Sequence, residues 1–138
     1  MTDSVVSPSH YVSDAPTLEP MELTMRLPHP LASAFEYVFR AGKKPGVSAT
    51  TDLSKARVWL SRTVEMMEIG FLCFPPMDQQ VPFLLMLFSS KNEFAKVLLD
   101  AYNANKTSSG ENDLWRIMFV AALEFVNEKI SEEVNKDI

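Results

Sequence analysis

Apolar side chains recur every three or four residues along most of the chain, which is the spacing of one face of an α-helix. Residues 83–88 are apolar throughout and fit a buried helix or a buried strand; we favour a helix because the neighbouring segments are helical. No segment alternates apolar and polar residues as a half-buried strand does. The pattern therefore predicts an all-α fold, a compact bundle of five or six helices. The other helices are expected over about residues 17–25, 30–41, 52–69, 90–102 and 113–134.

Small and polar residues mark the expected helix ends. Gly42 lies where a left-handed C-cap belongs, after the helix over 30–41. Thr51 or Asp52 is expected to begin the next helix. The segment from Ser90 to Glu93 has the spacing of a capping box at the start of the helix over 90–102.

The apolar stripes also predict what is buried. The helix over 52–69 is expected to bury Leu53, Ala56, Leu60, Val64 and Met67. Four methionines at helical spacing are expected in the core: Met21, Met25, Met66 and Met67. Residues 114–126 are apolar on nearly every side, which fits burial between layers or in an oligomer interface. Because this is more apolar surface than one small core needs, we expect a homo-oligomer.

The length of 138 residues suits one domain. The polar segment over residues 1–16 contains two prolines and predicts an irregular arm. A single helical domain is expected over 17–138. Its first half, 17–69, is the basic half, and its second half, 70–138, is apolar and acidic.

The net charge of −5 is unremarkable, but it is unevenly distributed. Residues 1–25 carry −4, residues 26–62 carry +5 and residues 63–138 carry −6. The acidic flanks would repel a long polyanion, whereas a compact anion would meet only the basic block. The distribution favours a small phosphorylated partner over long nucleic acid.

Several classes of protein are excluded by what the sequence lacks. Cys73 is the single cysteine, so an intramolecular disulfide and a Cys-rich zinc site are impossible. The four glycines cannot form a P-loop, and no apolar run approaches the roughly 20 residues that span a bilayer. The first residues lack the features of a signal peptide. We therefore expect a cytoplasmic protein with no membrane partner.

The basic block predicts a phosphate site. Arg40, Lys43 and Lys44 end one helix, and a loop of about ten residues makes the next helix its antiparallel neighbour. These cations then lie beside the free N–H groups of a helix N-terminus, which favour anions. Three exposed side chains of the second helix could complete the site: Lys55, Trp59, which could stack on a base, and Arg62. Alternatively, the cations only complement the dipole of the first helix, and Trp59 only packs.

Three motifs in this half resemble a known family. They are Pro8-Ser-His10-Tyr11, a helix end from Ala34 to Lys44 of the form Ala-x-x-Tyr-x-x-Arg-Ala-Gly-Lys-Lys, and a helix from Asp52 to Arg62 of the form Asp-Leu-x-Lys-Ala-x-x-Trp-Leu-x-Arg. Their order and spacing resemble small phage proteins described as nucleotide kinases. The resemblance covers about residues 7–65. One departure is Glu36, where the family usually has a lysine.

The resemblance implies an enzyme without a P-loop, made in the cytoplasm of an infected bacterial host. It would transfer a phosphoryl group from a nucleoside triphosphate to a deoxynucleoside monophosphate, with Mg²⁺. It implies that His10 orients or deprotonates the acceptor, that Tyr11 binds base or phosphate, and that Asp52 holds Mg²⁺ and contributes to catalysis. It implies a cationic clamp of Arg40, Lys43, Lys44 and Lys55.

Three other functions remain open on sequence grounds. One is a non-catalytic nucleotide-binding protein that sequesters a nucleotide from the host. Another is an all-α nucleoside triphosphate pyrophosphatase, in which Glu65 and Glu68 would face an acidic pair on another helix. Candidates for that second pair are Glu124, Glu128, Glu132 and Glu133. The last is a pure interaction protein that uses its apolar C-terminal helix.

Overall fold

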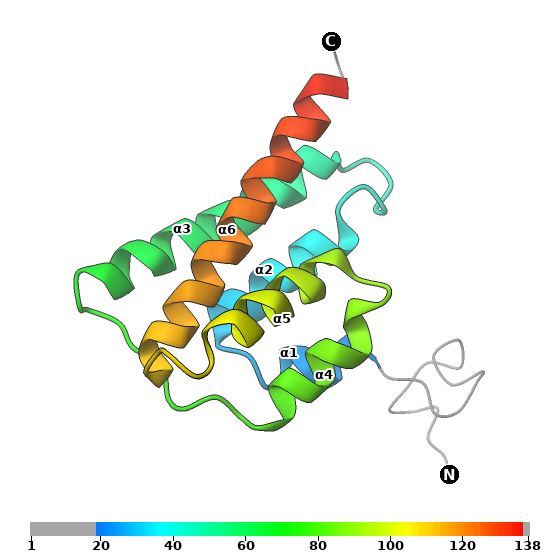
Figure 1. Cartoon of the computed structure of the whole chain (residues 1–138). Coiled ribbons are helices and arrows are strands. Elements are labelled where there is room, and N and C mark those ends of the chain that lie inside the picture. Colours follow the sequence, from blue (N-terminus) through cyan, green and yellow to red (C-terminus); the bar gives the residue numbers. More distant parts are fainter. Residues whose placement is uncertain (1–18, 137–138) are drawn as a thin grey trace.

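A computed structural model describes residues 19–136, and these residues form six α-helices and no strand (Figure 1). The predicted all-α fold is confirmed. The expected arm over residues 1–16 lies outside the described residues. The helices are α1 (Pro20–Thr24), α2 (His29–Arg40), α3 (Ala49–Glu68), α4 (Gln80–Ser89), α5 (Glu93–Asn105) and α6 (Glu111–Lys136).

The two long helices, α3 and α6, organise the bundle. Figure 1 shows α6 crossing α3, and α6 also packs against α5, while α2 packs on α3 and α4 packs on α5. Because α6 lies between α3 and α5, each apolar residue of 114–126 is buried or half-buried. The expected burial of this helix between layers is confirmed. Within residues 19–136, no helix is both long enough and apolar enough to cross a membrane.

One core cluster receives side chains from all six helices. Trp115 of α6 is 2% exposed, and its indole N–H donates to the carbonyl of Pro75 at 3.1 Å. This bond fixes the connector between α3 and α4 against α6. Phe35 and Phe94 meet edge to face with centroids 5.7 Å apart, which joins α2 to α5.

The structure corrects two predicted helix starts. Helix α3 begins at Ala49, because the hydroxyl of Ser48 accepts from the N–H of Thr51 at 3.1 Å. Asp52 therefore lies inside the first turn. The predicted capping box of Ser90 is wrong: Asn92 caps α5 by accepting from the N–H of Ala95 at 2.9 Å, and Ser90 ends α4. Gly42, with φ of +79°, is left-handed as predicted.

The predicted stripe of α3 is buried, but the methionine prediction is wrong for three of the four residues. Met67 is 6% exposed, whereas Met21, Met25 and Met66 are 53%, 68% and 44% exposed. Helix α1 is a single turn that buries Leu23 instead. Met66 lies on the face of α3 that points away from the core.

Candidate functional site

The polar face of α2 and Trp59 of α3 form a cavity of about 310 Å³, which we call the α2–α3 cleft. On α2, polar residues follow at spacings of three and four and so share one face. On α3, Asp52, Lys55 and Trp59 share the facing side for the same reason. The cleft is lined by His29, Ser33, Glu36, Tyr37, Arg40 and Trp59.

A buried carboxylate holds the guanidinium at the end of α2. The Nε atom of Arg40 lies 3.6 Å from Oδ1 of Asp52, whose side chain is 2% exposed. The other oxygen of Asp52 is buried without a hydrogen-bond partner among the described residues. An isolated buried carboxylate is costly, so Asp52 depends on Arg40 for its charge balance. In return, Asp52 restricts where the half-exposed guanidinium can lie.

Two cations approach one aromatic ring in this region. The Cζ atom of Arg40 lies 4.8 Å from the ring centroid of Tyr37, and Nζ of Lys55 lies 5.6 Å from the same centroid. Both distances fit cation–π contacts. One cation comes from α2 and the other from α3, so helix packing brings them together. Arg40 lines the cleft and Lys55 lies beside it, so two neighbouring positive groups make this end of the cleft suited to an anion.

The other part of the cleft is aromatic. The rings of His29 and Trp59 meet edge to face, with centroids 5.2 Å apart and an interplanar angle of 89°. Trp59 is 37% exposed, so part of its ring remains accessible. Glu36 adds an exposed carboxylate to the lining. The lining therefore combines the guanidinium of Arg40, an accessible aromatic ring and hydrogen-bond acceptors such as the carboxylate of Glu36.

The structure separates the remaining predicted residues from this cleft. Lys43 follows the turn at Gly42, lies 4.1 Å from the ring centroid of Phe39 and lines a different cavity. Lys44 is exposed in the loop before α3. Arg62 lines an apolar groove on the outer face of α3 that Trp59 shares. Thus Arg40, Asp52, Lys55 and Trp59 are brought together, whereas Lys43, Lys44 and Arg62 are not.

His10 and Tyr11, which the resemblance places in the same site, lie outside the described residues.

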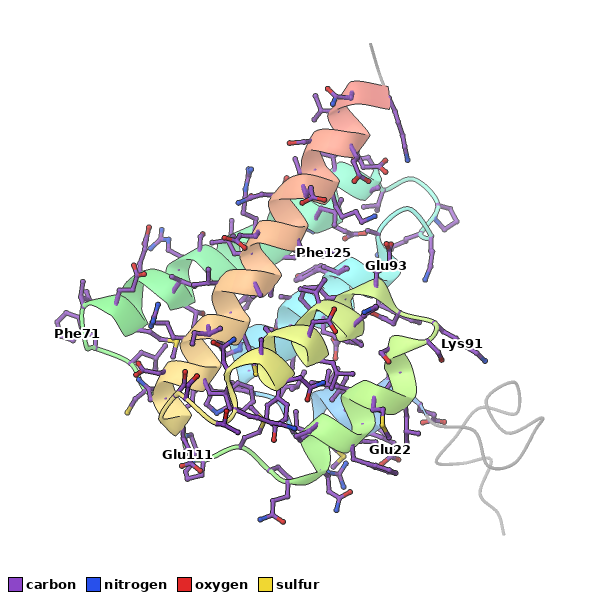
Figure 2. The ribbon with its side chains drawn as sticks, viewed as in Figure 1. Glu22, Phe71, Lys91, Glu93, Glu111 and Phe125 are labelled. Carbon is purple, nitrogen blue, oxygen red and sulfur yellow. The ribbon has the colours of Figure 1, made fainter. Side chains whose placement is uncertain are left out.

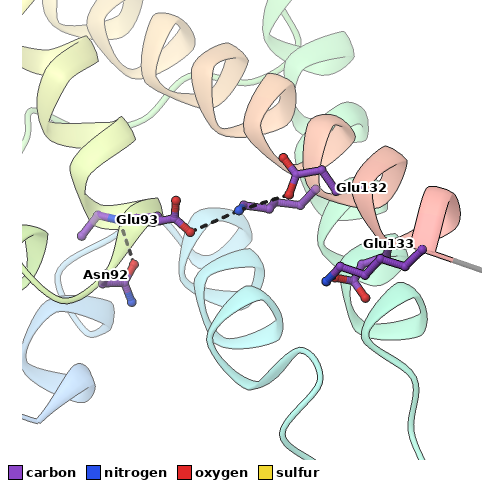
Figure 3. Close-up of polar contacts among 7 residues, drawn as sticks. Asn92, Glu93, Glu132 and Glu133 are labelled. Carbon is purple, nitrogen blue, oxygen red and sulfur yellow. Dashed lines mark hydrogen bonds and ion pairs between the residues drawn. The ribbon is translucent and has the colours of Figure 1, made fainter.

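The cavity that Lys43 lines lies between the ends of α2, α3, α5 and α6 and has a volume of about 290 Å³; we call it the α5–α6 cavity. Apolar and charged residues both line it, among them Glu93 and Phe125, which are labelled in Figure 2. Lys129 lies 3.2 Å from Glu93 and 3.5 Å from Glu132 (Figure 3). The hydrogen bond that Lys129 donates to Glu93, together with the negative charges of Glu93 and Glu132, raises the pKa of Lys129 above its ordinary 10.5.

The predicted magnesium ligand fits only weakly. Asp52 is buried and paired with Arg40, whereas protein Mg²⁺ sites keep several waters. Over residues 19–136, no three His, Cys, Asp or Glu side chains come together as a metal site. Glu65 and Glu68 are both exposed on α3.

Three residues that line the cleft were not predicted as site residues: His29, Ser33 and Tyr37. The signal was present, because His29, Ser33, Tyr37 and Arg40 follow at spacings of four, four and three. Such a polar stripe on an amphipathic helix usually only faces water. This stripe differs because it faces α3 on the side that carries Asp52, Lys55 and Trp59.

Comparisons of the chain with protein-family models, with curated protein sequences and with solved structures give no match. The resemblance to phage nucleotide kinases therefore stays a prediction.

Proposed function

We propose that this protein binds a nucleoside phosphate in the α2–α3 cleft. The observation that supports the proposal best is the approach of Arg40 and Lys55 to the ring of Tyr37, beside the accessible ring of Trp59. Cations bind phosphate oxygens, and an aromatic face stacks on a base of any kind. A nucleotide carries both groups in one compact ligand.

Each end of the ligand has a partner in the cleft. The phosphates lie against Arg40 and Lys55, where the planar guanidinium can donate two parallel hydrogen bonds. The base stacks on Trp59, whose other contact is His29. Glu36 repels phosphate but accepts hydrogen bonds, so it suits a sugar hydroxyl or an amino group of the base.

Asp52 acts through Arg40 in this proposal. Its buried carboxylate orients the guanidinium and does not touch the ligand. Mg²⁺, where the ligand carries it, is held mainly by the phosphate oxygens and water.

Phosphoryl transfer is the second candidate function, because His29 lines the same cleft and a ring N–H of an imidazole can donate a hydrogen bond to a phosphoryl oxygen. An oxygen of the acceptor monophosphate forms a bond to the γ-phosphorus of the donor. The bond from that phosphorus to the β,γ-bridging oxygen breaks, and the nucleoside diphosphate leaves with the electron pair. Arg40 and Lys55 stabilise the charge on the transferred group, and His29 hydrogen-bonds to it.

Calorimetric titration with nucleoside mono-, di- and triphosphates, with and without Mg²⁺, tests the binding proposal. Lys55→Gln is expected to weaken binding about tenfold or more, because it removes a charge-assisted hydrogen bond. Lys44→Gln is the matched control: it removes the same charge from the same basic block outside the cleft, and binding should be retained. Equal losses in both variants, or no binding to the wild type, would overturn the proposal.

Chromatography of the same mixtures tests the reaction. A deoxynucleoside diphosphate that forms from the monophosphate and a triphosphate supports the kinase. Binding without any product supports the sequestering protein instead.

A further inference from the structure

The outer face of α3 carries a stripe of four exposed residues that points away from the core. Val58, Arg62, Glu65 and Ile69 follow at spacings of four, three and four, so they lie on one side of the helix. Val58 is 57% exposed and Ile69, the C-cap residue, is 65% exposed. The buried stripe of α3 lies on the opposite side. Figure 1 shows α3 at the edge of the bundle, with α6 on one side.

The order of residues in this stripe is self-complementary. Along the helix it reads apolar, positive, negative, apolar. A second α3 that runs antiparallel, related by a twofold axis, sets Val58 against Ile69 and Arg62 against Glu65. Twofold symmetry makes each of these contacts twice. A parallel second helix would instead set like charges together.

The side of the stripe that faces α2 supports the same arrangement. Trp59 and Met66 both lie there, are 37% and 44% exposed, and line one apolar groove of about 270 Å³. A twofold axis perpendicular to antiparallel helices keeps this side of one copy against the same side of the other. The register that pairs Arg62 with Glu65 then brings Met66 of one copy over Trp59 of the other. Sulfur–aromatic contacts of this kind are favourable.

We propose that two copies of this chain dimerise through antiparallel α3 helices. A second copy occupies the groove, because the charged and apolar residues of its own stripe match this stripe in order and spacing. The dimer buries the groove side of Trp59 and leaves the side that lines the α2–α3 cleft. The proposal shares Trp59 with nucleotide binding, but none of its contacts involves Arg40 or Lys55.

Sedimentation velocity over a range of protein concentrations tests this dimer, with charge reversals in the stripe. Arg62→Glu sets glutamate against Glu65 twice, and Glu65→Arg sets two arginines together twice. Each single variant is expected to raise the dimer dissociation constant at least about tenfold, because like charges in an interface repel. The double variant Arg62→Glu with Glu65→Arg restores both opposite-charge contacts and should return the constant close to that of the wild type. Lys91→Glu, in the exposed α4–α5 loop, is the control and should not change it.

A cross-link tests the register. In a Cys73→Ser background, Val58→Cys with Ile69→Cys should oxidise to a covalent dimer, whereas Val58→Cys alone should not, because residue 58 does not face its own copy. Circular dichroism confirms that the variants fold. A wild type that stays monomeric at the highest concentration overturns the proposal. So does a dimer whose double charge reversal is as weak as the single variants, or one that cross-links equally through Val58→Cys alone.

Discussion

The α2–α3 cleft and the α5–α6 cavity both combine lysine or arginine with acidic and aromatic residues, yet they use their charges differently. In the cavity, Lys129 lies between Glu93 and Glu132. Lys43 lines the same cavity, lies over the ring of Phe39 and forms no ion pair within residues 19–136. In the cleft, Asp52 contacts one edge of Arg40, and Lys55 forms no ion pair within residues 19–136. Lys129 therefore mainly joins α5 to α6, whereas Lys43 and Lys55 each lie on an aromatic ring and remain available to an anion. The cleft differs from the cavity because a second cation, Arg40, shares the ring of Tyr37 with Lys55. Net charge alone would not separate these two regions.

The largest expected effect tests whether the side chains that line the α5–α6 cavity stabilise the fold. Phe94 lines it, is 1% exposed and packs against both Phe35 and Phe125. Phe94→Ala should lower the free energy of unfolding by about 4 kcal/mol, because it leaves a hole in a close-packed core. Urea denaturation measures the loss. The nucleotide affinity of the folded protein should be unchanged; a protein that keeps its stability would contradict the packing role.

The second-largest effect tests how strongly the buried carboxylate of Asp52 depends on Arg40. Arg40→Met should lower the free energy of unfolding by about 2 kcal/mol, since Asp52 is left as an unpaired buried charge. Arg40→Met combined with Asp52→Asn should be more stable than Arg40→Met alone. Urea denaturation of the wild type, of Arg40→Met, of Asp52→Asn alone and of the double variant completes the cycle. Strict additivity of the two substitutions would show that the pair is not coupled.

The smallest effect concerns the ion pair of the cavity. Lys129→Met should cost about 0.5 kcal/mol at neutral pH, as is typical of partly exposed pairs. The pKa of Lys129 is raised in the folded protein, so its contribution is present below the ordinary lysine value of 10.5 and is lost as pH rises through the raised value. Thermal unfolding of both proteins across alkaline pH should show the difference shrinking. A difference that grows with pH would reverse the sign of this linkage.

Helical periodicity predicted the fold because it follows from burial. The apolar stripe of α3 and the segment of α6 that is apolar on nearly every side can be removed from water only by packing against other helices. Helix starts were less predictable, since Ser48, Thr51 and Asp52 are all good caps and the sequence pattern does not choose among them, whereas in the structure Ser48 accepts from the N–H of Thr51. The prediction that Met21 and Met25 are buried was wrong because α1 is a single turn, and either side of a single turn can face the core.

The candidate site was predictable where residues share a helix. Asp52, Lys55 and Trp59 face one way on α3 because of their spacing, and the α2–α3 packing adds Arg40. The direction of Lys43 was not predictable, because it depends on the path of the chain after Gly42. Tyr37 was missed because an aromatic residue on an amphipathic helix normally suggests packing, and its two cation contacts exist only in the folded molecule.

One titration tests the difference between the two regions most directly. Lys55→Gln in the cleft and Lys43→Gln in the α5–α6 cavity each remove one positive charge from the same basic block. If the cleft holds the phosphates, Lys55→Gln weakens the binding of a nucleoside triphosphate about tenfold or more, and Lys43→Gln leaves its affinity close to that of the wild type. The reverse order, with Lys43→Gln as the damaging change, would move the site to the other cavity and contradict the account.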